Sequence, residues 1–188
     1  MNAIFITVRT GSTRLLNKAL LKIKDETTIE HLIKRLKKSS LAEEIVLCTT
    51  TLAEDDILCE LASKNGIKHH RGSVEDKLER WNGASKQYNV EFFVTADGDD
   101  LFCEPELIDL AFEQYNNSKC DFIKAEGVIC GSFTYGIKTS ALEKVCEIKN
   151  TDNTEMMWVY FTDTGLFNVK DLQNIPKDFL RTDIRMTL

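Results

Sequence analysis

Hydrophobic positions along the chain fall into two patterns. Short continuous apolar runs are typical of strands buried in a parallel sheet, and they lie in residues 3–8, 44–49 and 91–95. Residues 67–70 and 121–125 are expected to be further strands. Between these runs, apolar residues recur every three or four positions, which predicts amphipathic helices from residue 29, over 55–64, over 74–88 and from 105. This alternation predicts a three-layer α/β fold with a mostly parallel sheet.

Local signals mark where several helices begin. Thr27 with Glu30 has the spacing of a capping box in front of the first helix, and Ser140 with Glu143 has the same spacing later in the chain. Pro105 suits the first turn of a helix, because its missing N–H would have no partner there. We therefore expect helices to begin at all three places.

Other segments have weaker patterns. Residues 9–28 are expected to be a loop, and residues 133–138 a further strand. The apolar and aromatic stretch 155–162 has no clear assignment. No repeat or Pro-rich linker divides the chain, so we expect one domain, 1–188.

Composition narrows the class of protein. Of 188 residues, 43% are hydrophobic, which excludes a disordered chain. No stretch approaches the roughly 18 apolar residues that cross a bilayer, and Met1 is followed directly by an apolar run without a basic leader. A soluble, cytoplasmic protein without a membrane partner is expected. The six cysteines lack zinc-finger spacing, so we expect reduced, buried thiols.

Charge is distributed unevenly along the chain. The net charge is −6, but residues 1–40 hold nine basic and three acidic residues, a local charge of +6. The acidic character of residues 41–188 argues against a protein that coats nucleic acid. The basic front suggests a small anionic ligand; alternatively, the basic residues of 34–38 only solvate one helix face.

The carboxyl ends of the predicted strands select the candidate loops. Ligands of open parallel sheets bind in the crevice beyond these ends. The segments concerned are a first loop, 9–18, a second, 49–51, a third, 71–76, and a fourth, 97–104.

The first loop has the groups that a polyphosphate needs. Arg9, Arg14 and Lys18 supply positive charge, while Gly11 and Ser12 supply backbone and hydroxyl donors. The spacing matches neither a Walker loop nor the dinucleotide fingerprint. An ordinary surface turn is the alternative, but the position after the first buried strand favours phosphate binding.

The fourth loop is acidic. Asp97, Asp99 and Asp100 stand within four residues. Carboxylates so close together repel one another, so a structure that gathers them usually provides a cation, and magnesium shared with phosphates is the natural candidate. A solvated acidic turn is the alternative. The first and fourth loops are expected to face each other across this ion.

The third loop offers two further cations. Arg71 and Arg80 could bind an anion, although Arg80 could instead pair with an acidic neighbour on its own helix. His69 and His70 are adjacent on a strand and point to opposite faces, so we interpret them as structural. No serine, histidine and aspartate set or reactive cysteine stands out, so a covalent intermediate lacks support.

Three ordered motifs carry a family resemblance. The first is Arg-x-Gly-Ser-x-Arg-Leu at residues 9–15, followed by Lys18. The second is Arg71-Gly72-Ser73 followed by Leu78-Glu79-Arg80-Trp81. The third begins with Gly98-Asp99 and continues to Pro105. With them the chain resembles the cytidylyltransferase family, which includes CMP-KDO synthetase, acylneuraminate cytidylyltransferase and the spore coat polysaccharide biosynthesis protein F type.

The resemblance implies a Rossmann-like nucleotidyltransferase fold of the glycosyltransferase-A type and transfer of CMP from CTP to a small anionic sugar-type acceptor. The first loop (Arg9, Gly11, Ser12, Arg14, Lys18) would hold the triphosphate, and Arg9, Arg14 and Lys18 would promote the reaction. Asp99 and Asp97 would bind magnesium, and Asp97 would also contribute to nucleotide binding. We expect Thr49 and Thr50 near the base, and Arg71 and Arg80 at the acceptor.

Departures from the family pattern leave alternatives open. Leu16 and Leu101 replace prolines, and Arg185–Leu188 resembles the start of a family segment with a second metal carboxylate, which suggests a truncated end. A sugar-1-phosphate guanylyltransferase and a non-catalytic nucleotide-binding module are the other hypotheses. The stretch 128–161 could form a homodimer interface or pack in the core.

Overall fold

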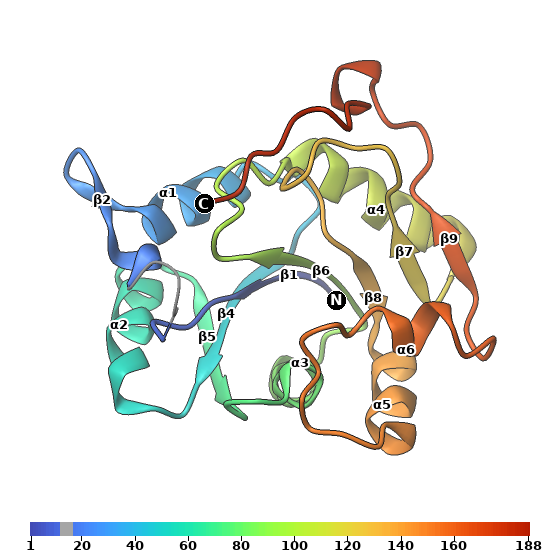
Figure 1. Ribbon diagram of the computed structural model, residues 1–188, viewed down its shortest axis with the longest axis horizontal. Coiled ribbons are helices and arrows are strands. Elements are labelled where there is room, and N and C mark those ends of the chain that lie inside the picture. The colour runs from blue at the N-terminus through green and yellow to red at the C-terminus, as the bar shows by residue number, and fades with distance from the viewer. Residues whose placement is uncertain (12–16) are drawn as a thin grey trace.

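The computed structural model describes residues 1–11 and 17–188. Within these residues one mixed sheet runs through the centre of the molecule (Figure 1). Its strands, in spatial order, are β5 (Lys68–Gly72), β4 (Glu44–Thr50), β1 (Asn2–Thr7), β6 (Phe92–Asp97), β8 (Gly136–Lys138), β7 (Phe122–Lys124) and β9 (Val169–Asp171). In this sheet, as far as the chain is described, β8 alone runs antiparallel to its neighbours. The predicted three-layer, mostly parallel architecture is confirmed.

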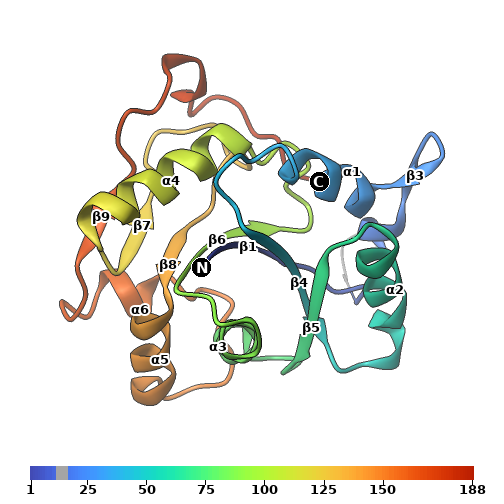
Figure 2. The same cartoon turned by 180° about the vertical axis from the view of Figure 1, so that it is seen from behind.

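Helices cover both faces of the sheet. They are α1 (Thr28–Leu36), α2 (Asp56–Lys64), α3 (Lys77–Tyr88), α4 (Pro105–Ser118), α5 (Thr139–Ile148) and the short α6 (Val159–Thr162). The first, second and fourth lie on one face, and α3, α5 and α6 on the other (Figures 1 and 2). None of the described helices has the length and apolar character to cross a membrane.

The central strand explains why its sequence is continuously apolar. Ile4 and Ile6 of β1 enter the core beneath α1, α2 and α4, while Ala3 and Phe5 enter the core on the α3 side. All four residues are fully buried. Because both faces of this strand are covered, no position favours a polar residue, and each large apolar side chain buried contributes about 1.5–3 kcal/mol.

Aromatic packing reinforces the core on the α3 side. The rings of Phe5 and Phe93 stack with their centroids 4.2 Å apart, and Trp81 meets Phe93 edge-on at 5.9 Å. Such pairs add about 0.5–1.5 kcal/mol beyond their buried area. They join α3 to the two central strands.

Two helix starts follow the sequence signals and one does not. The capping box of Thr27 and Glu30 is formed, and Pro105 begins α4. The expected box of Ser140 and Glu143 is wrong, because α5 begins at Thr139 and has no side-chain cap. There the strand β8 runs directly into the helix, so Ser140 lies inside the first turn.

Two other boundaries differ from expectation. The segment 9–28, expected to be loop, contains a small hairpin of β2 (Lys22–Ile23) and β3 (Glu26–Thr27). The helix expected from residue 74 begins at Lys77, because the side chain of Asp76 caps it. The 3-10 turns Lys18–Leu20, Ala53–Asp55 and Lys177–Phe179 complete the elements described.

The end of the chain returns to the middle of the molecule. From β9 it passes over the loop between β6 and α4, as the red segment of Figure 1 shows. There the N–H of Leu188 donates to the carbonyl of Asp99 at 3.0 Å, and the N–H of Met186 donates to the carbonyl of Cys130 at 2.8 Å. The last residues of the chain therefore also help to hold the loop that carries Asp99.

Candidate active site

A cavity of about 490 Å³ lies beyond the carboxyl ends of β1 and β6. The two strands are parallel and in register there, with Thr7 opposite Asp97. Among the described residues, its charged lining consists of the cations Arg9, Lys18, Lys77 and Arg80 and the carboxylates Glu75, Asp97, Asp99 and Glu155. Mixed charge of this density, placed at the crevice of an open sheet, is typical of a site for an anionic ligand with a cation.

The basic first loop and the acidic fourth loop meet in this cavity, as expected. The Lys18 amine lies 2.5 Å from Oδ2 of Asp99, although the two residues are 81 positions apart. Both side chains are partly buried, with 21% and 27% of their surface exposed. Reduced exposure to water makes this ion pair stronger than one on an open surface.

A second ion pair lies beside the first. The amine of Lys77 is 2.9 Å from Oδ1 of Asp97 and 5.2 Å from the centre of the Trp81 ring. The indole N–H of Trp81 donates to the hydroxyl of Thr7 at 2.8 Å. These contacts attach the first turn of α3 to the ends of β1 and β6, so the two aspartates face lysines on different elements.

Two arginines complete the cationic lining. Arg9 donates to the carbonyl of Val74 at 3.3 Å, which joins the first loop to the third. Arg80 is 5% exposed and donates to the carbonyl of Ser73 at 3.0 Å. Burial lowers the pKa of Arg80, which nevertheless stays charged because an arginine starts so high. A desolvated guanidinium favours an anionic partner.

A buried aspartate fixes the start of the first loop. Asp55 accepts hydrogen bonds from the N–H and the hydroxyl of Thr10, at 2.8 and 2.7 Å, and from the hydroxyl of Thr50. Burial alone would raise the pKa of Asp55, but these hydrogen bonds outweigh it and hold the pKa below its usual value. The carboxylate therefore joins the first and second loops.

Three residues expected in the site lie elsewhere. Thr49 and Thr50 are fully buried, and neither they nor Arg71 is among the described residues that line the cavity. Arg71 donates to the carbonyls of Thr50 and Leu52, at 3.0 and 2.8 Å, and pairs with Asp56 at 2.6 Å. It thus holds the second loop against the edge strand.

The third carboxylate of the acidic loop is also set apart. Asp100 is 7% exposed and, among the described residues, does not line the cavity. Burial, together with the nearby charges of Asp97 and Asp99, raises the pKa of Asp100 to about 7, while the charges of Lys77 and Lys18 oppose the shift. Near neutral pH this carboxyl is partly protonated, which relieves repulsion in the loop.

The remaining predicted site residues divide into two groups. Gly11 lines the cavity, whereas Ser12 and Arg14 lie outside the described residues. The sequence interpretation missed Lys77, Glu75, Asn153 and Glu155, all of which line the cavity. Glu75 lies in the third loop and Lys77 directly follows it, so both were within reach of the rule that ligands bind beyond the strand ends (the strand-end rule). Asn153 and Glu155 come from the segment after α5, where no sequence signal marks them.

Comparisons with known proteins agree on one family. A family model described as cytidylyltransferase matches residues 3–175. Over 186 residues the chain is 35% identical to an uncharacterized protein of Methanocaldococcus jannaschii, covering 97% of this chain and 76% of that one. Over 190 residues it is 24% identical to the spore coat polysaccharide biosynthesis protein SpsF of Bacillus subtilis, covering 97% and 79%.

Solved structures give the same result. A cytidylyltransferase from Leptospira borgpetersenii superposes with a TM-score of 0.88 at 29% identity, covering 100% of this chain and 80% of the other. A CMP:2-keto-3-deoxy-manno-octonic acid synthetase complexed with CTP superposes with a TM-score of 0.69 at 13% identity, covering 90% and 89%. At this low identity, the match to the synthetase shows that the two proteins share a fold.

Proposed function

Since the chain belongs to the cytidylyltransferase family, we propose that it transfers CMP from CTP to a sugar acid or a related acceptor and releases pyrophosphate. In this reaction an acceptor oxygen attacks the α-phosphate of CTP and pyrophosphate leaves in line. The observation that carries the proposal is the contact of Lys18 with Asp99, which brings the basic and acidic loops together in one cavity. The relatives named for polysaccharide biosynthesis and for 3-deoxy-manno-octulosonate support this class of acceptor.

Positive charge in the cavity suits the triphosphate. Nucleotidyl transfer depends on alignment and on neutralisation of charge that spreads over the phosphate oxygens, more than on a protein nucleophile. Lys18 and Arg9 would bind the phosphates, together with Ser12 and Arg14 of the same loop. Lys77 at the start of α3 would add positive charge, since it lines the same cavity.

The acidic loop has donors that fit magnesium. Among the described contacts, Lys18 uses Oδ2 of Asp99 and Lys77 uses Oδ1 of Asp97, which leaves the second oxygen of each carboxylate for a cation. Magnesium is commonly held by one or two carboxylates together with phosphates. Asp99 and Asp97 would hold it, and the ion would neutralise charge on the phosphates. Lys18 and Lys77 would keep the two carboxylates oriented before the nucleotide binds.

Nucleotide binding tests the choice of CTP. We expect CTP with magnesium to raise the melting temperature by several degrees, and CTP alone or ATP, UTP and GTP with magnesium to raise it less. Selective stabilisation by GTP would favour a sugar-1-phosphate guanylyltransferase instead. Stabilisation by CTP without release of pyrophosphate, with acceptors supplied, would indicate a non-catalytic binding module.

Two variants test the residues. Lys18→Ala and Asp99→Asn should each lower pyrophosphate release at least about 100-fold, because the first removes a positive charge that would bind the phosphates and the second removes a carboxylate that would hold magnesium. Lys22→Ala and Asp178→Asn change exposed residues of the same types and should leave turnover unchanged. Circular dichroism would establish that all four variants are folded. Wild-type turnover in Lys18→Ala or Asp99→Asn would refute the role given to that residue.

A further inference from the structure

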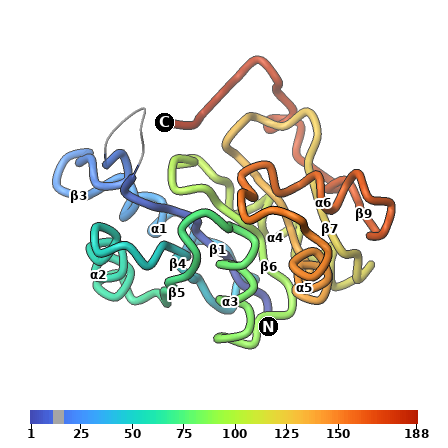
Figure 3. The backbone as a smooth tube through the Cα atoms, turned by 60° about the horizontal axis from the view of Figure 1, so that its bottom comes forward, coloured from blue at the N-terminus to red at the C-terminus, as the bar shows by residue number. Residues whose placement is uncertain are grey.

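The segment 149–158 between α5 and α6, here called the strap, forms one wall of the cavity. It leaves the end of α5, passes beside α3 and returns to α6, as the orange segment of Figures 1 and 3 shows. Asn153 and Glu155 of the strap line the cavity. Among the residues that line the cavity, these two lie farthest along the chain from the first and fourth loops.

The first anchor of the strap is the residue that caps α3. The hydroxyl of Thr154, which is 1% exposed, donates to Oδ1 of Asp76 at 3.0 Å and accepts from the N–H of Leu78 at 3.2 Å. The amine of Lys149 lies 2.5 Å from Oδ2 of Asp76. Asp76 also accepts from the N–H of Glu79, at 3.1 Å. One buried carboxylate therefore begins the helix and fixes the strap to it.

The second anchor is apolar. Met157 is 1% exposed and Phe161 is fully buried, both in the core between α3, α5 and the sheet. Trp158 stacks beside Tyr135 with ring centroids 6.2 Å apart. The strap is thus held on both sides of Glu155.

Between these anchors, the two neighbours of Thr154 line the cavity. Thr154 faces α3, whereas Asn153 and Glu155, directly before and after it, line the cavity. Groups supported by packed elements and by buried hydrogen bonds are positioned well enough to discriminate between ligands.

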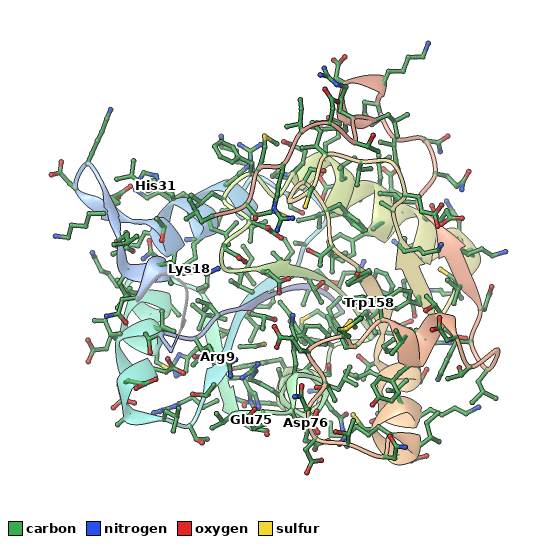
Figure 4. All side chains as sticks on the ribbon, in the orientation of Figure 1. Arg9, Lys18, His31, Glu75, Asp76 and Trp158 are labelled. Carbon is green, nitrogen blue, oxygen red and sulfur yellow. The ribbon has the colours of Figure 1, made fainter. Side chains whose placement is uncertain are left out.

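The charge of this wall differs from that of the wall with Lys18. Figure 4 shows Lys18 and Glu75 well apart, with Arg9 between them. Glu75 and Glu155 both line the cavity and would repel a triphosphate there, but a carboxylate accepts hydrogen bonds readily from hydroxyl groups. Burial lowers the pKa of Arg80, and the negative charge of Glu155 is among the influences that oppose this shift, so the carboxylate attracts the guanidinium. A ligand rich in hydroxyls that also carries an anionic group fits this combination.

We propose that Asn153 and Glu155 form the acceptor subsite, in which Glu155 accepts hydrogen bonds from the hydroxyls of a polyhydroxylated, anionic acceptor. Asn153 both donates and accepts beside it, and Arg80 meets the anionic group of the acceptor. This inference rests on the proposed function, because it assigns the acceptor end of the same cavity.

Kinetics with separate substrates test the subsite. The acceptor probes are 3-deoxy-manno-octulosonate, N-acetylneuraminate and a hexose 1-phosphate, and the assay follows pyrophosphate release from CTP. Glu155→Gln and Asn153→Ala should raise KM for the acceptor at least about 10-fold and leave KM for CTP within about twofold. Glu147→Gln, an exposed glutamate at the end of α5, is the matched control. Equal acceptor KM in Glu155→Gln and wild type would overturn the inference.

The anchor has its own test. Thr154→Val keeps the shape of the side chain but removes the hydroxyl that holds the strap, so it should raise KM for the acceptor in the same direction. Thr154→Ser keeps the hydroxyl and should restore a value close to that of the wild type. If the serine variant is as impaired as the valine variant, the hydrogen bond to Asp76 does not position the subsite.

Direct binding separates this inference from the proposed function. If the wild-type protein releases no pyrophosphate with any probe, the proposed function fails, and saturation-transfer difference NMR with the same three probes decides the subsite. Binding to the wild type that is lost in Glu155→Gln would support it. No binding to the wild type, or equal binding to both proteins, would overturn it.

Discussion

Gly98 stands between the two cavity carboxylates because no side chain fits there. A Cβ at this position would lie 2.7 Å from both Cβ and Cγ2 of Val8, and 3.3 Å from the carbonyl oxygen of Thr7. The glycine N–H also donates to that carbonyl, at 2.9 Å. The close approach of the acidic loop to the end of β1 thus depends on a single missing methyl group.

Replacing this glycine should disturb the site directly. Gly98→Ala forces the acidic loop away from β1, so we expect at least about 10-fold slower pyrophosphate release and a loss of about 1–3 kcal/mol in the free energy of unfolding. Steady-state assays and urea unfolding measure the two effects.

The control for this variant is Gly127→Ala. Its φ of +73° strains any side chain, but a Cβ there would meet nothing within 4 Å. That variant should lose about 1 kcal/mol of stability and keep full turnover. Full turnover in Gly98→Ala would show that the close contact is dispensable.

At the scale of single elements, the cap of α1 shows how one side chain serves several partners. Glu30 accepts hydrogen bonds from the N–H of Thr27 at 2.9 Å and its hydroxyl at 2.8 Å, and from Lys64 of α2 at 2.9 Å. The backbone hydrogen bond from Thr27 and the contact with Lys64 lower the pKa of Glu30 to about 2, against the opposing effect of burial. The cap therefore also connects α1 to α2.

This cap should make the free energy of unfolding fall as the pH is lowered below about 4.5. Because the folded pKa, about 2, lies below the ordinary value of 4.5, the contribution of Glu30 is complete above about pH 4.5 and is lost as the pH falls toward 2. We expect Glu30→Gln to lose about 1–3 kcal/mol at pH 6 and much less near pH 3.

Urea unfolding across this pH range measures the effect. Glu113→Gln, at an exposed position on α4, should follow the wild-type curve. A stability difference between Glu30→Gln and wild type that stays constant from pH 6 to pH 3 would mean that ionisation of Glu30 does not stabilise the fold.

At the scale of the whole molecule, the two hydrophobic cores, one on each face of the sheet, determine which cysteine thiols are accessible to solvent. Cys48, Cys103 and Cys120 are buried, Cys59 and Cys146 are half-buried, and Cys130 is exposed. Burial raises the pKa of the Cys48 and Cys103 thiols, which keeps them protonated and unreactive near neutral pH.

Thiol labelling of the native protein should reproduce this order. With a coloured disulfide reagent at about pH 8, we expect Cys130 to react first and the three buried cysteines to react only after unfolding in guanidinium. Cys130→Ser should remove the fast phase. Fast reaction of three or more thiols would contradict the packing of the core, and fewer than six reactive thiols after unfolding would contradict the expectation of reduced cysteines.

Local sequence by itself predicted the alternation of strands and helices through residue 125, apart from the hairpin of β2 and β3, and the loops where chemistry gathers. A strand buried on both faces must be apolar throughout, as the run at Ala3–Ile6 is, and a box such as Thr27 with Glu30 is completed within one helical turn. The strand-end rule then selected the loops of Lys18 and Asp99, which meet as expected. Each of these signals lies within a short stretch of chain.

Only the tertiary structure decided which side chains share the cavity. Thr49 lies near the carboxyl end of a strand, as the rule requires, yet it is buried, and Glu155, which no local pattern marked, lines the cavity. The strap is fixed by Thr154 and Asp76, 78 positions apart, and the reversed direction of β8 likewise depends on pairing with distant strands. Contacts between distant segments leave no periodic trace in the sequence, because periodicity records only which face of an element is buried, and not which partner covers it.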